Sequence, residues 1–279
     1  MQMVCTMPRN ALATVRLGAA LLILAVLAAC VARPAVDAHL PPFARLPYEP
    51  FSREAAVAIA LREWRLFDRP VRDDAPGAGS LSDADRKLER LPGLWQRIGE
   101  YWWLGLNADA AERGWTGKHD GHGAAFPPDE DGSYAWSAAF ISYVMRMAGA
   151  GSRFPYSGSH SDYINQGRDA SLGRIASPAV RAERPDLYAP QLGDLVCYGR
   201  GWANTVRFED FPADYFPSHC DIVVGVEPGQ LSVVGGNVED AVAMKHVPTT
   251  ADGELAGPEQ VPVDDRYPWF MVVWVLYDR

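Results

Sequence analysis

The sequence has few cysteines, few basic residues for its number of acidic ones, and no long apolar run. None of its four cysteines lies in a Cys-x-x-Cys pair, so nothing indicates a four-ligand zinc site. Its 26 lysine and arginine residues are outnumbered by 35 aspartate and glutamate residues, for a net charge of −9. Nucleic-acid binding requires clustered Lys and Arg to contact phosphates. We therefore expect no nucleic-acid partner.

An apolar run at residues 17–29 is 13 residues long, whereas a helix needs about 20 residues to cross a bilayer. It follows Arg9 and Arg16 and ends in small residues, as secretion signals do. The segment LAAC at 27–30 resembles a bacterial lipobox, which implies cleavage before Cys30 and acylation of that residue. We expect residues 1–29 to be a lipoprotein signal peptide.

Acyl chains on Cys30 would anchor the protein to a membrane. We therefore expect it in the cell envelope, lipid-anchored on the periplasmic side, at the outer membrane. Residues 30–50 contain five prolines and are expected to form an extended tether. Residues 51–279 are enough for one well-buried core, so we expect a single domain there.

The first half of this domain has helical patterns and the second half has strand patterns. Helices are predicted over 52–68, with Ser52 as N-cap, over 83–106 with a kink at Pro92, over 135–148, and near 160–165. Five short segments rich in β-branched residues predict strands at 193–199, 219–226, 230–237, 241–247 and 269–277. Helices followed by an antiparallel sheet predict an α+β fold.

Two cysteines, Cys197 and Cys220, remain in the expected domain. Outside the inner membrane the environment is oxidising, so such a pair is most often a disulfide. Both residues lie in predicted strands. We predict a disulfide between neighbouring strands, with Cys220 facing away from the side chain of His219, its neighbour in the sequence.

Three polar residues occupy positions suited to chemistry. Ser137 lies in the first turn of a predicted helix, His219 begins a predicted strand, and Asn237 ends the next predicted strand. Each has a simpler explanation: serine is a favoured helix cap, histidine often has a structural role, and asparagine after two glycines is typical of a turn. Taken together, the three residues and their positions at the ends of predicted elements indicate a joint role more strongly than each residue does alone.

The motifs around these residues resemble a known group of enzymes. WSAAFISYVMRMAG, LGDLVCYGR, HCDIVVGV and GGNVEDAV are similar to segments of papain-like cell-wall amidases and peptidases of the CHAP type, and the set resembles the bacterial family DUF2272. The resemblance covers about residues 130–250. It implies a papain-like fold with Ser137 as nucleophile in place of cysteine, His219 as base and Asn237 as the residue that orients it.

Serine in place of cysteine changes what the site requires. A cysteine thiol can form a stable thiolate–imidazolium pair with a histidine, whereas a serine hydroxyl cannot lose its proton in this way. Serine therefore needs a histidine that acts as a general base during the attack, and an anion that stabilises the imidazolium. Asn237 carries no charge, but Asp221 shares a strand face with His219, and Asp240 is a weaker candidate. We expect Asn237 or Asp221 to orient His219.

Trp136, Tyr134 and His160 are expected to line the groove beside Ser137. No metal or cofactor is expected. The sequence thus predicts a secreted lipoprotein that hydrolyses amide bonds in peptidoglycan peptide. The alternative is a non-catalytic protein that binds peptidoglycan or another envelope component in a degenerate papain-like groove.

Overall fold

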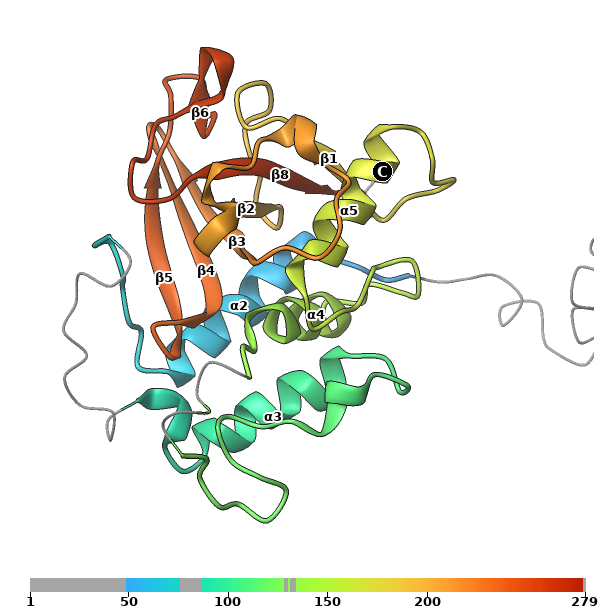
Figure 1. Ribbon diagram of the computed structural model, residues 1–279. Helices are drawn as coiled ribbons and strands as arrows, with labels where there is room; N and C mark the ends of the chain where they lie inside the picture. Colours follow the sequence, from blue (N-terminus) through green and yellow to red (C-terminus); the bar gives the residue numbers. More distant parts are fainter. Residues whose placement is uncertain (1–48, 76–86, 128–129, 131–133, 278–279) are drawn as a thin grey trace, which may run out of the picture. The chain divides into compact units, whose positions relative to one another are not determined.

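A six-stranded antiparallel sheet dominates the C-terminal half of the fold (Figure 1). The computed structural model describes residues 49–75, 87–127, 130 and 134–277. Cys30, the expected signal peptide and most of the tether lie outside the described residues. The strand order is β1-β8-β2-β3-β4-β5. Its strands are β1 (Val180–Glu183), β2 (Leu195–Gly199), β3 (Ser218–Glu227), β4 (Gln230–Val238), β5 (Ala241–Pro248) and β8 (Trp269–Val275).

All five predicted strands are present, as β2, β3, β4, β5 and β8. Their β-branched side chains suit a pleated, buried surface. The β3–β4 hairpin turns at Gly229, whose φ of 79° favours glycine. Three short strands were not predicted: β1, β6 (Ala256–Gly257) and β7 (Val261–Pro262), of which the last two form a small sheet of their own.

The first two helices bear out the sequence patterns with one correction. In α2 (Arg53–Leu66), the Ser52 hydroxyl caps the helix by accepting a 3.1 Å hydrogen bond from the backbone N–H of Ala55. The predicted kink at Pro92 is instead a complete break between a 3₁₀ turn, Leu88–Arg90, and α3 (Leu94–Gly105). Proline disfavours helical geometry in the residue before it, which explains the break.

Helix α4 (Ser137–Met147) is the central helix, in contact with α2, α3, β3 and β4. Its residues from Ser137 to Met145 are all buried. Gly105 allows α3 to approach closely, because a Cβ there would lie 2.8 Å from the carbonyl oxygen of Ala139. Helix α5 (His160–Ser171) is longer than predicted and packs on β1 and β8.

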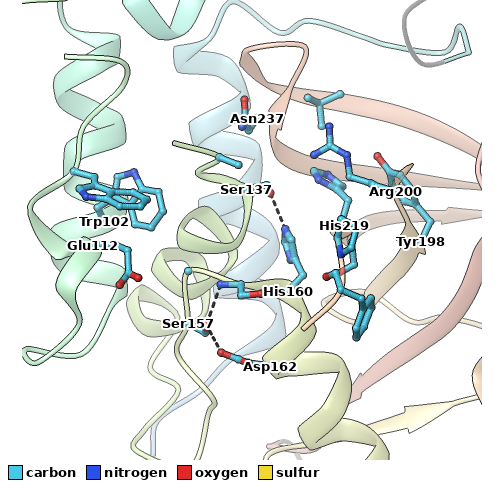
Figure 2. Close-up of a pocket in the computed structure, with 18 of the residues that line it drawn as sticks. Trp102, Glu112, Ser137, Ser157, His160, Asp162, Tyr198, Arg200, His219 and Asn237 are labelled. Carbon is cyan, nitrogen blue, oxygen red and sulfur yellow. Dashed lines mark hydrogen bonds between the residues drawn. The ribbon is translucent and has the colours of Figure 1, made fainter. Parts of the chain in front are cut away.

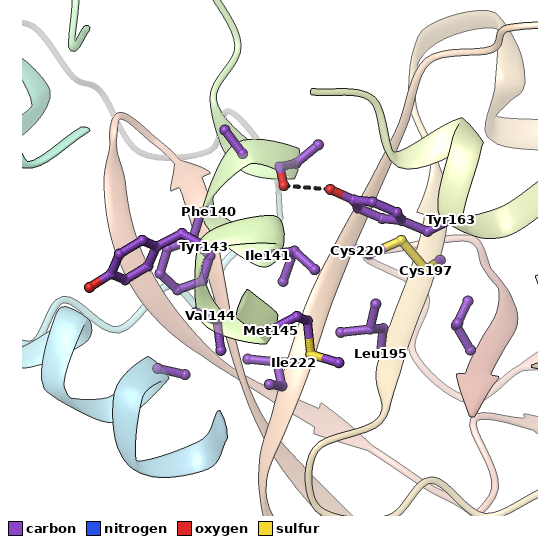
Figure 3. Packing of buried hydrophobic residues seen from close by; sticks show 14 of the residues in the cluster. Phe140, Ile141, Tyr143, Val144, Met145, Tyr163, Leu195, Cys197, Cys220 and Ile222 are labelled. Carbon is purple, nitrogen blue, oxygen red and sulfur yellow. Dashed lines mark hydrogen bonds between the residues drawn. A yellow bond between two sulfur atoms is a disulfide. The ribbon is translucent and has the colours of Figure 1, made fainter. Parts of the chain in front are cut away.

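The main core lies between α4 and the sheet (Figure 3). Ile141 and Met145 of α4 belong to the same buried cluster as Leu195 of β2 and Ile222 of β3. The described residues all belong to one compact unit. In the part of the chain described, no helix is both long enough and apolar enough to cross a membrane. The fold class is α+β, as predicted.

The predicted disulfide is confirmed. Cys197 on β2 and Cys220 on β3 lie directly opposite each other, with their Cα atoms 4.2 Å apart and their sulfur atoms bonded. Both side chains are fully buried in the main core. Because side chains alternate along a strand, this places Cys220 on the opposite face of β3 from His219.

Candidate active site

Ser137 is the first residue of α4, and its side chain does not cap the helix. The N-cap is Trp136, and no side chain makes a capping hydrogen bond there. The Oγ atom of Ser137 instead lies 2.8 Å from Nε2 of His160 (Figure 2). The simplest explanation for this serine, a helix cap, therefore does not hold.

His160 is the first residue of α5 and is almost completely buried. Burial and the neighbouring imidazole of His219 hold the pKa of His160 well below its usual range. A position at a helix N-terminus also disfavours a positive charge. His160 is therefore neutral at pH 7, and one of its ring nitrogens is free to accept a proton.

His219 lies on β3 beside Asp221. Its Nε2 atom is 3.0 Å from Oδ1 of Asp221, and both side chains are buried. Burial lowers the pKa of His219 to about 4, although the carboxylate of Asp221 acts in the opposite direction. Burial alone would raise the pKa of Asp221, but the ammonium of Lys245 and then His219 hold it below its usual range. Asp221 thus lies on the same strand face as His219, as its position two residues further along the strand predicted.

The two imidazoles lie side by side, with ring centroids 5.2 Å apart. The hydrogen-bond partner of Ser137 is His160, and the partner of His219 is Asp221. The direct Ser137–His219 hydrogen bond that a simple dyad would need is thus not formed in this structure. Helix α5 brings His160 to that place: the sequence predicted His160 at the groove beside Ser137, but not its hydrogen bond to the serine.

Asn237 lines the same pocket near Ser137 (Figure 2). Its φ of 54° is in the left-handed region, which asparagine tolerates better than most residues. The two glycines before it make room for the site. A Cβ at Gly235 would lie 1.8 Å from Oδ1 of Asp221, and one at Gly236 would lie 2.5 Å from Cβ of Phe140. Within the described structure, the orienting contact to His219 comes from Asp221, and Asn237 makes no hydrogen bond to that ring.

The pocket has a volume of about 1030 Å³. Ser137, His160, His219 and Asn237 all line it. Its walls also carry charged residues of both signs: Arg72, Lys87, Lys118, Arg200, Glu112, Asp162, Glu239 and Asp240. Lys87 lies 3.1 Å from Asp240, so that carboxylate forms an ion pair with a lysine, and the carboxylate beside His219 is the one of Asp221.

Two residues expected to line the groove do not do so. Trp136 is fully buried, and its indole N–H donates a 2.8 Å hydrogen bond to the carboxyl of Glu89. Tyr134 packs its ring on Phe126, with centroids 4.5 Å apart, and against Trp115. These aromatic rings find apolar neighbours behind the pocket wall, which position along the sequence does not reveal. His160, the third expected residue, does line the pocket.

A family model supports the relationship that the motifs suggested. Residues 89–275 match the family described as uncharacterized protein conserved in bacteria (DUF2272). The chain belongs to the DUF2272 family. The region matched begins at Glu89 and includes all of α3 to β8, and with them Ser137, His160, His219, Asp221, Asn237 and Lys245. No curated protein and no solved structure matches the chain significantly.

Two buried charged residues of this DUF2272 chain were not recognised from its sequence. Lys245 lies on β5 with its Nζ atom 2.6 Å from Oδ2 of Asp221. Glu89 lies under the start of α4, and burial together with the carboxylate of Asp240 raises the pKa of Glu89 to about 7. A lysine inside a largely apolar strand was a usable signal for Lys245, because lysine is almost never fully buried without a partner.

Proposed function

We propose that this protein is an amide hydrolase of papain-like fold that acts on peptidoglycan peptide, with Ser137 as its nucleophile. The observation that carries the proposal is the 2.8 Å contact between Ser137 Oγ and a neutral imidazole, His160, inside a large pocket. A nucleophile in hydrogen-bond reach of a base is the basic requirement of acyl transfer.

In the acylation step, Ser137 Oγ attacks the carbonyl carbon of the substrate amide. Its proton passes to Nε2 of His160 and then to the leaving nitrogen as the C–N bond breaks. The products of this step are an ester on Ser137 and a free amine. The first N–H groups of a helix have no partner within the helix, so those at the start of α4 are available to stabilise the oxyanion.

In the deacylation step, a water molecule attacks the ester carbonyl and gives one proton to an imidazole. As the C–O bond breaks, that proton passes to Oγ of Ser137, which releases a carboxylic acid and restores the serine hydroxyl. His219 is suited to accept the proton of this water. Its Nδ1 atom is buried without a hydrogen-bond partner in the described structure, and Asp221 behind the ring stabilises the imidazolium that forms. The two imidazoles thus have separate parts in one cycle.

The papain-like fold is supported by the order of the site residues in the structure. The nucleophile begins a helix packed on an antiparallel sheet, the histidine with a carboxylate behind it is on β3, and Asn237 is the next-to-last residue of β4. Peptidoglycan peptide as substrate is supported by the lipobox-like segment and by the motif resemblance. A pocket of about 1030 Å³ is at the upper limit for small-molecule sites, which suits a peptide of several residues.

A non-catalytic role in binding peptidoglycan or another envelope component is the second candidate, and one observation favours it. The supporting carboxylate, Asp221, lies beside His219 and not beside His160, which contacts Ser137. The Nδ1 atom of His160 has no hydrogen-bond partner among the described residues. An imidazolium on His160 would therefore lack the anion that a serine nucleophile normally requires.

Turnover of purified peptidoglycan fragments, followed by mass spectrometry, separates the two candidates. We expect Ser137→Ala to reduce kcat/KM by at least about 10³-fold, and the double variant with His160→Ala to be little worse, because the two residues act together. Ser171→Ala is the matched control, since Ser171 ends α5 and is not part of the pocket wall. Full activity of Ser137→Ala would rule out Ser137 as the nucleophile. Binding of the fragments without turnover by the natural protein would support the second candidate, the non-catalytic binding role.

A further inference from the structure

Lys245 is a charged residue in an unusual place. It lies on β5 with no exposed surface, and its Nζ atom is 2.6 Å from Oδ2 of Asp221, which is equally buried. Breaking such a pair by removing one partner leaves an uncompensated buried charge. The pair is therefore an integral part of the structure behind His219.

Three aromatic rings surround the ammonium group of Lys245. Its Nζ atom lies 4.7 Å from the ring centroid of Tyr267, 5.0 Å from that of Tyr198 and 5.7 Å from that of Trp269. Aromatic faces attract a cation at these distances, most strongly where water is excluded. The three rings and the carboxylate of Asp221 thus surround the ammonium group with attractive contacts.

The ion pair crosses the strand between its partners. Asp221 is on β3, Lys245 is on β5, and β4 lies between them. Gly235 of β4 makes the crossing possible, because a Cβ there would lie 1.8 Å from Oδ1 of Asp221 and 2.9 Å from Nε2 of His219. No other residue type leaves this space. The ion pair between Lys245 and Asp221 therefore depends on a glycine at position 235.

This arrangement determines which nitrogen of His219 carries the proton. With Lys245 as a cation, Asp221 is a carboxylate and can only accept hydrogen bonds. The atom of His219 that faces it at 3.0 Å is Nε2, which must therefore be the donor. In the neutral ring the lone pair is then on Nδ1, the nitrogen that has no partner in the described structure.

We propose that Lys245 is a positioning residue of this site, which holds Asp221 as an anion and so fixes His219 in the tautomer with its lone pair on Nδ1. The catalytic meaning of this tautomer rests on the proposed function, whereas the tautomer itself does not. The other titratable or charged groups around His219 are His160 of α5, Arg200 after β2 and the phenol of Tyr198, while the phenol of Tyr267 lies beside Lys245. Of these, none pairs with Asp221 as Lys245 does.

The test is a pH titration of the histidine imidazoles by NMR, on the full chain labelled with ¹⁵N-histidine and purified in detergent. The chain has 6 histidines, and the His219 signals are assigned as those lost in His219→Gln. In the natural protein we expect the Nε2–H tautomer of His219 across the neutral pH range. A natural protein with the proton on Nδ1 overturns the proposal without any variant.

Lys245→Met removes the ammonium and keeps an apolar chain of similar length. We expect the titration midpoint of His219 to rise by roughly one pH unit or more, because the Asp221–His219 pair must then take up the positive charge that Lys245 supplied. Lys118→Met is the control: Lys118 is also a buried lysine at the pocket, and the midpoint of His219 should not move. An unchanged midpoint and tautomer in folded Lys245→Met overturn the proposal.

Should Lys245→Met fail to fold, the double variant Asp221→Asn with Lys245→Met removes both buried charges together. We expect its His219 to lose the strong preference for the Nε2–H tautomer, and an unchanged preference counts against the proposal. These readouts need no turnover, so the proposed hydrolase function can fail while they succeed. Where turnover is found, the acid limb of the kcat/KM profile should move in Lys245→Met by the same number of pH units as the NMR midpoint.

Discussion

Ser137 Oγ and His160 Nε2 are 2.8 Å apart, although the two residues are separated by 23 positions and begin different helices. The start of α4 supplies the hydroxyl and the start of α5 supplies the imidazole. Both helix ends are buried beside the same pocket. The contact therefore depends on how α5 packs beside α4, and it gives the serine a base other than the histidine its sequence motif suggests.

The first prediction concerns Ser137→Cys. We expect its thiol to have a lowered pKa and to react with iodoacetamide at pH 7 faster than an ordinary cysteine, because of the helix N-terminus and the adjacent imidazole. Adding His160→Gln should slow the reaction by removing that imidazole. Equal rates with and without His160 would show that this histidine does not activate the position. Peptidoglycan turnover by Ser137→Cys, but not by the natural protein, would favour the binding role.

The second prediction concerns the pH dependence of stability through Glu89. In the folded protein the pKa of Glu89 is raised from 4.5 to about 7. Between pH 4.5 and pH 7 the Glu89 carboxyl is therefore protonated in the folded protein and ionised in the unfolded chain. Stability from this group is present below pH 4.5 and is lost as the pH rises through 7. We expect Glu89→Gln to be stabilised relative to the natural protein by up to roughly 3 kcal/mol at pH 8.

The measurement for Glu89→Gln is thermal or urea unfolding of both proteins at pH 5 and at pH 8. Glutamine keeps an oxygen that accepts the indole N–H of Trp136, so the comparison isolates the charge. A difference between the two proteins that is the same at both pH values would contradict the raised pKa.

The third prediction compares two glycines. Gly235→Ala should destabilise the fold by about 1–3 kcal/mol, because its Cβ would meet Asp221 at 1.8 Å. Gly114→Ala is the matched control, since a Cβ there meets nothing within 4 Å, and it should change stability by no more than about 1 kcal/mol. Urea unfolding measures both. Equal effects would mean that Gly235 is not needed to make room for the carboxylate.

The fourth prediction concerns the disulfide. Replacing both Cys197 and Cys220 by alanine should lower the free energy of unfolding by about 3 kcal/mol, from the loop that the bond closes. A maleimide reagent applied to the denatured, unreduced natural protein should label neither cysteine, and should label both after reduction. Labelling of both before reduction would show that the bond does not form in the cell.

The fifth prediction is lipidation at Cys30. Mass spectrometry of the mature N-terminus should find this cysteine as the first residue, with acyl chains on its sulfur and amino group. Cys30→Ser should release the protein from the membrane fraction. A Cys30→Ser protein that stays with the membrane would contradict a lipid anchor.

Much of the fold was predictable because its signals are local. The five main strands have β-branched runs bounded by turn residues, and Ser52 has the side chain and position of an N-cap, so each could be read within a short window. The pairing of Cys197 with Cys220 was also predictable, because few cysteines left few partners. The break at Pro92 was assigned as a kink, since the proline is a local signal but the geometry beyond it is not.

The sequence by itself determined the helix that begins at Ser137, the strand that holds His219 and Asp221, and the family, because short-range patterns and motifs carry all of these. Only the tertiary structure decided that His160 contacts Ser137, that Trp136 and Tyr134 pack behind the pocket wall, and that Lys245 reaches Asp221 past Gly235. The physical reason is range. Hydrophobic periodicity and turn chemistry act over a few residues, whereas these contacts join elements whose relative positions depend on the packing of the whole core.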